Sequence, residues 1–262
     1  MAIEIFNRYE NKYMIDCDTY EKLQGRLSDY MEPDAYNRQG DTYSICNIYY
    51  DTTDSHLIRT SLQKPAYKEK LRVRSYGAAE SDGMVYVEIK KKVRSLVNKR
   101  RSGITLSAAE QFLKTGIKPE ICEGMNEQVI NETAYLLSHK QLQPAVYLAY
   151  ERMAWFGTGQ HDLRVSFDSS IVTRRADLSL SSPVYGEPLL DPNLRLMEIK
   201  VAQSIPLWLS HLLSEYRIYP TSFSKYGREY QNQLRAQPQQ NFVILVPGEI
   251  TIPNYKGEVQ YA

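Results

Sequence analysis

The chain has 262 residues, of which 42% are hydrophobic and 24% are charged, as in an ordinary soluble globular protein. Its net charge of +1 excludes a polycation, so a basic site must come from local arrangement. The three cysteines, Cys17, Cys46 and Cys122, are too widely spaced for a disulfide framework or a zinc site. Because no apolar run approaches the ~18 residues that cross a bilayer and the start has no signal-peptide core, we expect a soluble cytoplasmic protein.

The first predicted elements are a strand and a helix. Residues 3–15 alternate as a strand, with Arg8, Glu10 and Lys12 on one face. Asp18 and Glu21 have the spacing of a capping box, which would begin the helix. Three further segments then alternate as strands: 41–52, 67–76 and 84–93.

The second part of the chain continues in the same way. Ser107 and Glu110 predict the start of a short helix that ends before Gly116. Longer helices are expected at 125–140, 205–218 and 224–236, and strands at 144–156, 163–175 and 194–201. We expect one domain over residues 1–236, with 237–262 as a tail or peripheral strand. Six or more antiparallel strands broken by occasional helices predict an α+β fold, for which a closed barrel is one solution.

Several predicted strands carry charges on one face and apolar side chains on the other. In segment 67–76, lysine or arginine recurs at every second residue from Lys68 to Arg74. The tetrads VEIK and MEIK, at 87–90 and 197–200, repeat the pattern with a glutamate and a lysine on one face. A single strand of this kind is ordinarily half buried, with a solvated charged face.

The repetition over the whole set favours another interpretation, a barrel with helices outside and charges inside. Buried charges are costly unless they are paired or bound to a ligand. A lumen rich in lysine and arginine with a few glutamates therefore predicts an anionic guest and a divalent cation.

The segments RYENKYMI, IYYDT, KLRVRSYG, VEIKKK, LRVSFD, MEIKV and FSKYGREY, in this order, resemble the VTC domain. This is the polyphosphate polymerase domain of the vacuolar transporter chaperone family, in the triphosphate tunnel metalloenzyme superfamily. The resemblance extends over roughly residues 5–235. It implies a closed tunnel of eight antiparallel strands with helices packed outside. It also implies transfer of the γ-phosphate of ATP to a growing polyphosphate chain, with release of ADP and use of Mn²⁺ or Mg²⁺.

The resemblance, together with the charged faces, suggests roles for individual residues. The expected catalytic residues are Arg72, Arg74, Lys90 and Lys225. The expected substrate-binding residues are Arg8, Lys12, Lys70, Arg152, Arg164 and Lys200. Glu198 is the expected metal ligand, with Glu88 and Glu10 as further candidates. Phosphoryl transfer depends mainly on positioning and charge neutralisation, which arginine forks, lysines and a carboxylate-bound metal can supply.

Three alternatives stay open. A CYTH-type hydrolase or cyclase of the same superfamily would carry Glu-x-Glu-x-Lys, where this chain has Arg8-x-Glu10-x-Lys12. A non-catalytic polyanion-binding module would gain nothing from Glu198, and an RNA-binding barrel would need exposed aromatics among its cations and a basic net charge. We therefore expect ATP and polyphosphate as partners and no nucleic acid. Eukaryotic relatives carry a sensor domain and a membrane region that we do not expect here, so a separate membrane-protein partner is an option, and the oligomeric state is open.

Overall fold

The computed structural model describes residues 9–37, 40–94 and 96–236. The described strands are β1 (Tyr9–Asp16), β2 (Met31–Pro33), β3 (Tyr43–Asp51), β4 (Tyr67–Tyr76), β5 (Met84–Val93), β6 (Leu96–Thr105), β7 (Gln143–Gly157), β8 (Gln160–Arg174), β9 (Glu187–Pro188) and β10 (Leu194–Val201). The described helices are α1 (Cys17–Leu27), α2 (His56–Leu62), α3 (Leu106–Thr115), α4 (Glu127–Lys140), α5 (Leu207–Glu215) and α6 (Lys225–Ala236), with a 3-10 turn at Ala35–Asn37. The expected tail at 237–262 lies outside the described residues.

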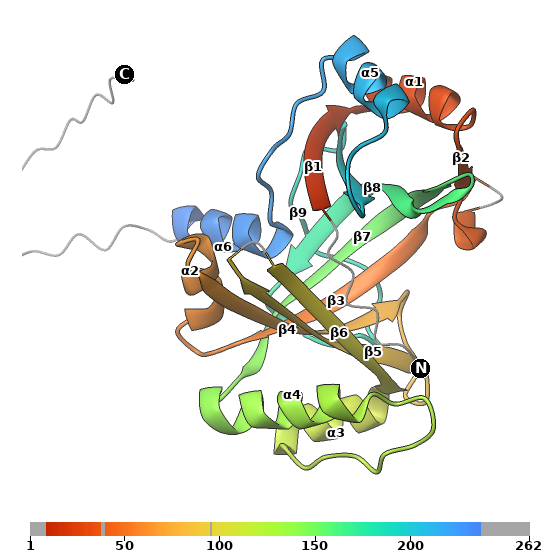
Figure 1. Cartoon of the computed structure of the whole chain (residues 1–262). Coiled ribbons are helices and arrows are strands. Elements are labelled where there is room, and N and C mark those ends of the chain that lie inside the picture. The colour runs from red at the N-terminus through yellow and green to blue at the C-terminus, as the bar shows by residue number, and fades with distance from the viewer. Residues whose placement is uncertain (1–8, 38–39, 95, 237–262) are drawn as a thin grey trace, which may run out of the picture.

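The strands form one antiparallel sheet in the order β1-β10-β8-β7-β3-β4-β5-β6, and the short β2 and β9 pair with β7 and β8. This confirms the predicted α+β class and antiparallel sheet. The sheet curls so that its two halves face each other (Figure 1).

Closure of the barrel, which the sequence led us to expect, is not confirmed. In the described ranges, β1 and β6 are the two ends of the sheet, and no backbone ladder joins them. The two halves instead meet through side chains, since Nζ of Lys90 on β5 lies 3.8 Å from Oε2 of Glu10 on β1. These long side chains lie between the two halves of the sheet, where a ladder of backbone hydrogen bonds would need the strands to be in direct contact.

The outer, convex face of the sheet is apolar and is covered by two pairs of helices. α3 and α4 cover the half made by β3 to β6, with Phe112 and Ile130 fully buried against it. α1 and α5 cover the half made by β1, β10 and β8, with Leu23 and Leu209 buried there (Figure 1). The charged faces point into the concave interior, where a third buried apolar cluster, with Tyr49 and Tyr226, forms as α6 packs on β3 and β7.

Local chemistry sets the ends of the helices. Gly116 ends α3 in the left-handed conformation, with φ of 74°, as the sequence predicts. The predicted starts are each two residues off, because Thr105 caps α3 and Asp16 caps α1 by accepting a hydrogen bond from the amide of Thr19. Of the helices in the described ranges, each is too short or too polar to cross a membrane.

Among the longer elements, β6 and α2 were not predicted, and neither were the short β2, β9 and the 3-10 turn. Segment 96–105 has little alternation of apolar residues, because its edge position leaves much of it exposed to solvent. α2 has seven residues and no side-chain cap from Ser55. Asp51, at the end of β3, accepts hydrogen bonds from the amides of Leu57 and Ile58 instead.

Candidate functional site

The strand register aligns the charged residues on the concave face. On β4, β5 and β6, Lys70 lies opposite Lys90, and Lys90 lies opposite Lys99. In the other half of the sheet, Lys12 lies opposite Glu198 on the neighbouring strand. Like charges directly opposite each other destabilise a sheet, so the row of three lysines needs a compensating anion.

Two arginines of β4 are held in fixed positions by their neighbours. Arg72 donates through Nε to Oε2 of Glu88 over 2.7 Å and through Nη1 to the hydroxyl of Tyr49 over 2.8 Å. Arg74 donates through Nε to Oδ1 of Asn47 over 3.0 Å. Cations that are oriented before the substrate arrives need little reorganisation to stabilise a developing charge.

Glu88 is 1% exposed and lies among cations rather than among other carboxylates. Its Oε1 has no hydrogen-bond partner and lies 3.3 Å from Nζ of Lys99 and 3.7 Å from Nη1 of Arg74. Burial raises the pKa of Glu88, but Arg72 and Arg74 outweigh it and hold the pKa well below its usual range. Glu88 therefore carries a charge that orients the arginines.

Lys99 of β6 also belongs to this cluster. Its side chain is 42% exposed and contacts Glu88 from the edge strand. Burial of the amine, together with the charges of Arg72 and Arg74, lowers the pKa of Lys99 to about 7, although Glu88 opposes the shift. Lys99 can therefore gain a proton when an anion binds near it.

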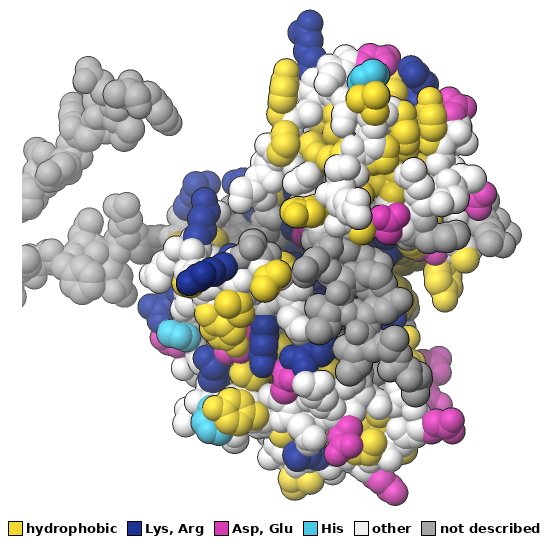
Figure 2. Space-filling view, viewed as in Figure 1, with side chains coloured by type: hydrophobic (Ala, Val, Ile, Leu, Met, Phe, Trp, Pro, Cys, Tyr) yellow, Lys and Arg dark blue, Asp and Glu magenta, His cyan; other side chains and the backbone are white. Residues whose placement is uncertain are grey.

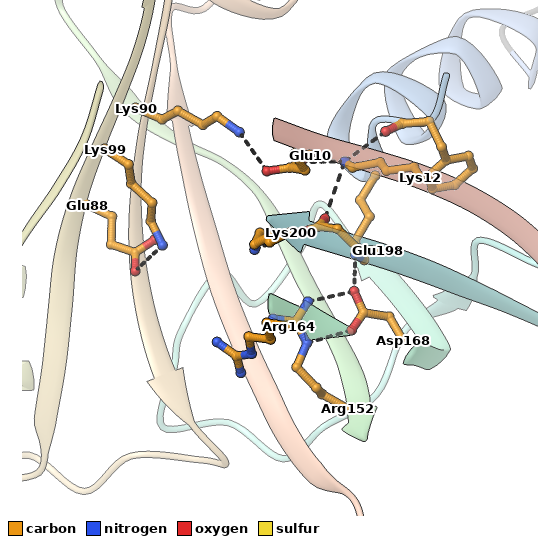
Figure 3. Close-up of polar contacts among 12 residues, drawn as sticks. Glu10, Lys12, Glu88, Lys90, Lys99, Arg152, Arg164, Asp168, Glu198 and Lys200 are labelled. Carbon is orange, nitrogen blue, oxygen red and sulfur yellow. Dashed lines mark hydrogen bonds and ion pairs between the residues drawn. The ribbon is translucent and has the colours of Figure 1, made fainter. Parts of the chain in front are cut away.

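The second cluster is centred on Glu198 of β10 (Figure 3). Its Oε1 lies 2.5 Å from Nζ of Lys200, and its Oε2 lies 3.8 Å from Nζ of Lys12. Burial raises the pKa of Glu198, but the charges of Lys200 and Lys12 outweigh this effect and hold the pKa well below its usual range. The carboxylate therefore stays ionised. Glu10 lies 3.5 Å from Lys12 and 3.8 Å from Lys90, which links the two halves of the sheet.

Asp168 of β8 forms the centre of a third cluster. Arg152 donates to its two carboxylate oxygens through Nε and Nη2, over 2.7 and 2.8 Å, and Lys225 donates to Oδ2 over 2.5 Å. Burial raises the pKa of the fully buried Asp168, but Arg152 and Lys225 outweigh it and lower the pKa to about 2. Asp168 thus fixes two predicted site residues that come from different elements. Figure 3 shows Asp168 beside one of them, Arg152.

The segment that enters α6 meets the lysines at one end of the concave face. Lys12 donates to the carbonyl oxygen of Phe223 over 3.0 Å, and Lys70 donates to Oγ of Ser224 over 3.3 Å. Burial and the neighbouring Lys90 and Lys12 lower the pKa of Lys70 to about 8, although Tyr49 opposes the shift. The predicted binding lysines are therefore close to the start of α6.

Arg164 lies toward another part of the face. Its Nη2 is 3.3 Å from both Oδ2 of Asp34 and the hydroxyl of Tyr43, and its buried Nε has no hydrogen-bond partner. Arg8, the remaining predicted binding residue, lies outside the described residues. The structure thus gathers most of the predicted residues on one concave face, and the members are Glu10, Lys12, Lys70, Arg72, Arg74, Glu88, Lys90, Arg152, Arg164, Glu198, Lys200 and Lys225.

Sequence reasoning missed four residues of the site: Asn47, Tyr49, Lys99 and Asp168. Asp168 shares its predicted strand face with Arg164, and this signal could have included it. The other three depend on which strands become neighbours. Burial would raise the pKa of Tyr49, but Arg72 and Lys70 lower it to about 8, which shows how strongly cationic this part of the face is.

The carboxylates of the face suit a divalent cation that shares its ligands with the substrate. No group of three or more His, Cys, Asp or Glu side chains in the described ranges could enclose a metal by itself. Glu198 is ionised and part of the concave face. Mg²⁺ commonly binds one or two carboxylates together with substrate phosphates and water, which this arrangement can provide.

With the fold and the charged face established, comparison with known families is decisive. A family model described as the VTC domain matches residues 7–233. The chain belongs to the VTC domain family. This confirms the resemblance that the sequence motifs suggested.

One solved structure agrees at the level of the fold. A protein of Bacillus halodurans, provisionally named an adenylate cyclase, is 14% identical with a TM-score of 0.51, over 82% of this chain and 92% of that chain. A Hippeastrum protein, provisionally named an adenylyl cyclase and described as having a dominant triphosphatase activity, is 12% identical with a TM-score of 0.48, over 85% of this VTC domain chain and 95% of its own. A search of curated proteins gives no match. Family and fold together place this VTC domain protein in the triphosphate tunnel superfamily.

Proposed function

We propose that this VTC domain protein is a polyphosphate polymerase that transfers the γ-phosphate of ATP to the end of a polyphosphate chain and releases ADP. The observation that carries the proposal is the row Lys70, Lys90 and Lys99, three lysines directly opposite one another on adjacent strands. From Lys70 to Arg74, the cations of β4 continue this surface along the strand for about 13 Å. A surface of this shape suits a linear anion with several phosphate groups.

The reaction needs one P–O bond to form and one to break. An oxygen of the terminal phosphate of the polymer attacks the γ-phosphorus, and the bond to the β-phosphate oxygen breaks, so that ADP leaves with the electron pair. The attacking group is already an anion, so no general base is required. Arg72 and Arg74, oriented by Glu88, Tyr49 and Asn47, offset the charge on the transferring group.

The other residues have supporting roles in this proposal. Lys12, Lys70, Lys90 and Lys200 bind phosphate oxygens as point charges, and Arg152 and Lys225 are held ready by Asp168. Glu198 would hold Mn²⁺ or Mg²⁺ together with phosphate oxygens, and such an ion would neutralise charge on the triphosphate. Glu10 is a further candidate ligand, whereas the contacts of Glu88 favour a positioning role.

The test is to incubate the purified protein with ATP and Mn²⁺ or Mg²⁺ and to measure ADP, inorganic phosphate and acid-labile polymer. The proposal expects polymer and ADP. Inorganic phosphate without polymer would contradict the polymerase and favour a CYTH-type triphosphatase. Tight binding of tripolyphosphate without turnover would favour a non-catalytic polyanion-binding module.

Arg72→Ala should reduce turnover by at least about 100-fold, because an oriented cation that stabilises transition-state charge is typically worth this much. A matched control is Arg100→Ala. Arg100 lies on the outer face of β6 and pairs there with Glu132 of α4, 2.6 Å away. Equal losses in the two variants would show that the concave face is not the site of the reaction.

A further inference from the structure

Three tyrosines from neighbouring strands form a cluster at one mouth of the concave face. Tyr43, Tyr76 and Tyr86 lie on β3, β4 and β5, and the ring of Tyr76 is 6.0 Å from each of the other two, centroid to centroid. Tyr43 is six residues along β3 from Tyr49, which packs against Tyr226 of α6 with 5.1 Å between centroids. The tyrosine cluster therefore lies toward the end of β3 that is away from α6.

Tyr36, which is 79% exposed, packs edge-on against Tyr43 with 5.9 Å between centroids, and among the three strand tyrosines Tyr76 is the one most open to solvent. It is 51% exposed, whereas Tyr43 and Tyr86 are partly buried. Tyr86 meets Tyr76 at an interplanar angle of 81° and Tyr43 meets it at 52°, so neither neighbour stacks flat on it. The guanidinium of Arg101 lies 4.5 Å from the ring centre of Tyr86. Tyr76 is thus held in place by two flanking rings, and the exposed part of its ring is available for another flat group to stack on.

The cluster is continuous with the cationic site. Tyr76 follows Arg74 by two residues on the same face of β4, about 7 Å along the strand. Tyr86 lies directly opposite Arg74 in the register, and the hydroxyl of Tyr43 is 3.3 Å from Nη2 of Arg164. Inorganic polyphosphate has no flat apolar part that could use these rings, whereas a nucleoside triphosphate carries one at a short distance from its phosphates.

We propose that Tyr76, flanked by Tyr43 and Tyr86, stacks on the base of a nucleoside triphosphate whose phosphates lie on Arg74 and Arg72. This inference rests on the proposed function and adds an orientation to it. The nucleoside enters at the tyrosine cluster, and the γ-phosphate points inward toward the lysine row of Lys70, Lys90 and Lys99. Stacking is tolerant of base identity, so ATP and GTP should bind about equally, and smaller pyrimidine bases should bind less tightly.

The test measures binding at equilibrium, without turnover, by calorimetry. The two probes are the β,γ-imido analogue of ATP and inorganic tripolyphosphate, each in the presence of Mg²⁺. Tyr76→Leu should weaken binding of the analogue about 10-fold, the size expected for loss of a base–aromatic stack, and should leave tripolyphosphate binding unchanged. The matched control is Tyr135→Leu, because Tyr135 is 61% exposed on α4, on the outer side of the sheet.

A second variant guards against a general effect of the substitution. Tyr76→Trp keeps a flat ring, so it should retain affinity for the analogue, and the fluorescence of the new indole should change with the analogue and not with tripolyphosphate. If Tyr76→Leu lost equal affinity for both ligands, or lost affinity for neither, the stacking role would be overturned. A wild-type protein that binds neither probe would instead overturn the phosphate site and the proposed function with it.

Discussion

Lys99 shows how the site can depend on the protonation of a single amine. Its pKa, lowered to about 7 by burial and by the nearby arginines, makes it charged in mildly acidic solution and neutral in mildly alkaline solution. An anion bound beside it stabilises the charged form. Affinity for tripolyphosphate should therefore be highest below about pH 7 and should fall as the pH rises from there toward about pH 9.

Lys99→Arg provides the comparison for this prediction, since arginine stays protonated throughout this range. The ratio of wild-type to variant dissociation constants removes the titration of the phosphate itself. This ratio should grow about 10-fold with rising pH, the approximate worth of one charge-assisted hydrogen bond. Calorimetric titrations at several pH values measure it, and a ratio that stays constant would show that Lys99 does not contact the anion.

The sequence predicted those site residues whose signal is local. Alternation in VEIK and MEIK correctly placed Glu88, Lys90, Glu198 and Lys200 on one face, because side-chain direction in a strand depends only on the neighbours in the chain. The role of Asp168 could not be predicted in this way. Its partners Arg152 and Lys225 lie 16 and 57 residues away, and only the folded arrangement brings them together.

At the scale of elements, α2 depends on a residue outside itself. Asp51 accepts hydrogen bonds from two amides of α2 and also from the hydroxyl of Tyr226 on α6, over 2.9 Å. It is fully buried, and its hydrogen bonds join β3, α2 and α6. A short helix with a remote cap has almost no signature in its own sequence, and for this reason α2 was missed.

Asp51→Ala should therefore destabilise the protein by about 2 kcal/mol or more, the sum of a lost cap and an unsatisfied buried hydroxyl. The loss should be local first, with faster amide hydrogen exchange over residues 56–62. Asp54→Ala is the control, because the side chain of Asp54 is 61% exposed and its partners are the exposed Arg59 of α2 and the hydroxyl of Thr52. Unchanged exchange in α2 would contradict the role of Asp51.

At the scale of the whole molecule, the sheet encloses an interior that carries more cations than carboxylates, and its end strands do not pair within the described ranges. Figure 2 shows hydrophobic side chains at the top of the view, over α1 and α5, and lysine and arginine side chains beside α2 and α6. The predicted closure of the barrel could not be decided from alternation. Whether the first and last strands meet depends on the coiling of the sheet and not on the pattern within any strand.

Binding of a polyanion should draw the two ends of the sheet together, because it neutralises the repulsion between the halves. At a tripolyphosphate concentration about 100 times the dissociation constant, stability should rise by about 2.7 kcal/mol. Amide exchange in β1 and β6 should slow more than exchange in β7, which lies within the sheet. Stabilisation without slower exchange at these two ends would show that the anion binds elsewhere. High salt should reduce the effect through screening.

The pairing of β1 with β10 has a consequence for synthesis on the ribosome. Tyr9 of β1 lies opposite Val201 of β10, so β1 cannot pair with β10 until nearly the whole domain has been translated. At ordinary rates of elongation this takes on the order of 10–40 s. Throughout this time a nascent chain carries a strand with one apolar face and no neighbour, and it is then that the protein is most exposed to aggregation and has most need of a chaperone.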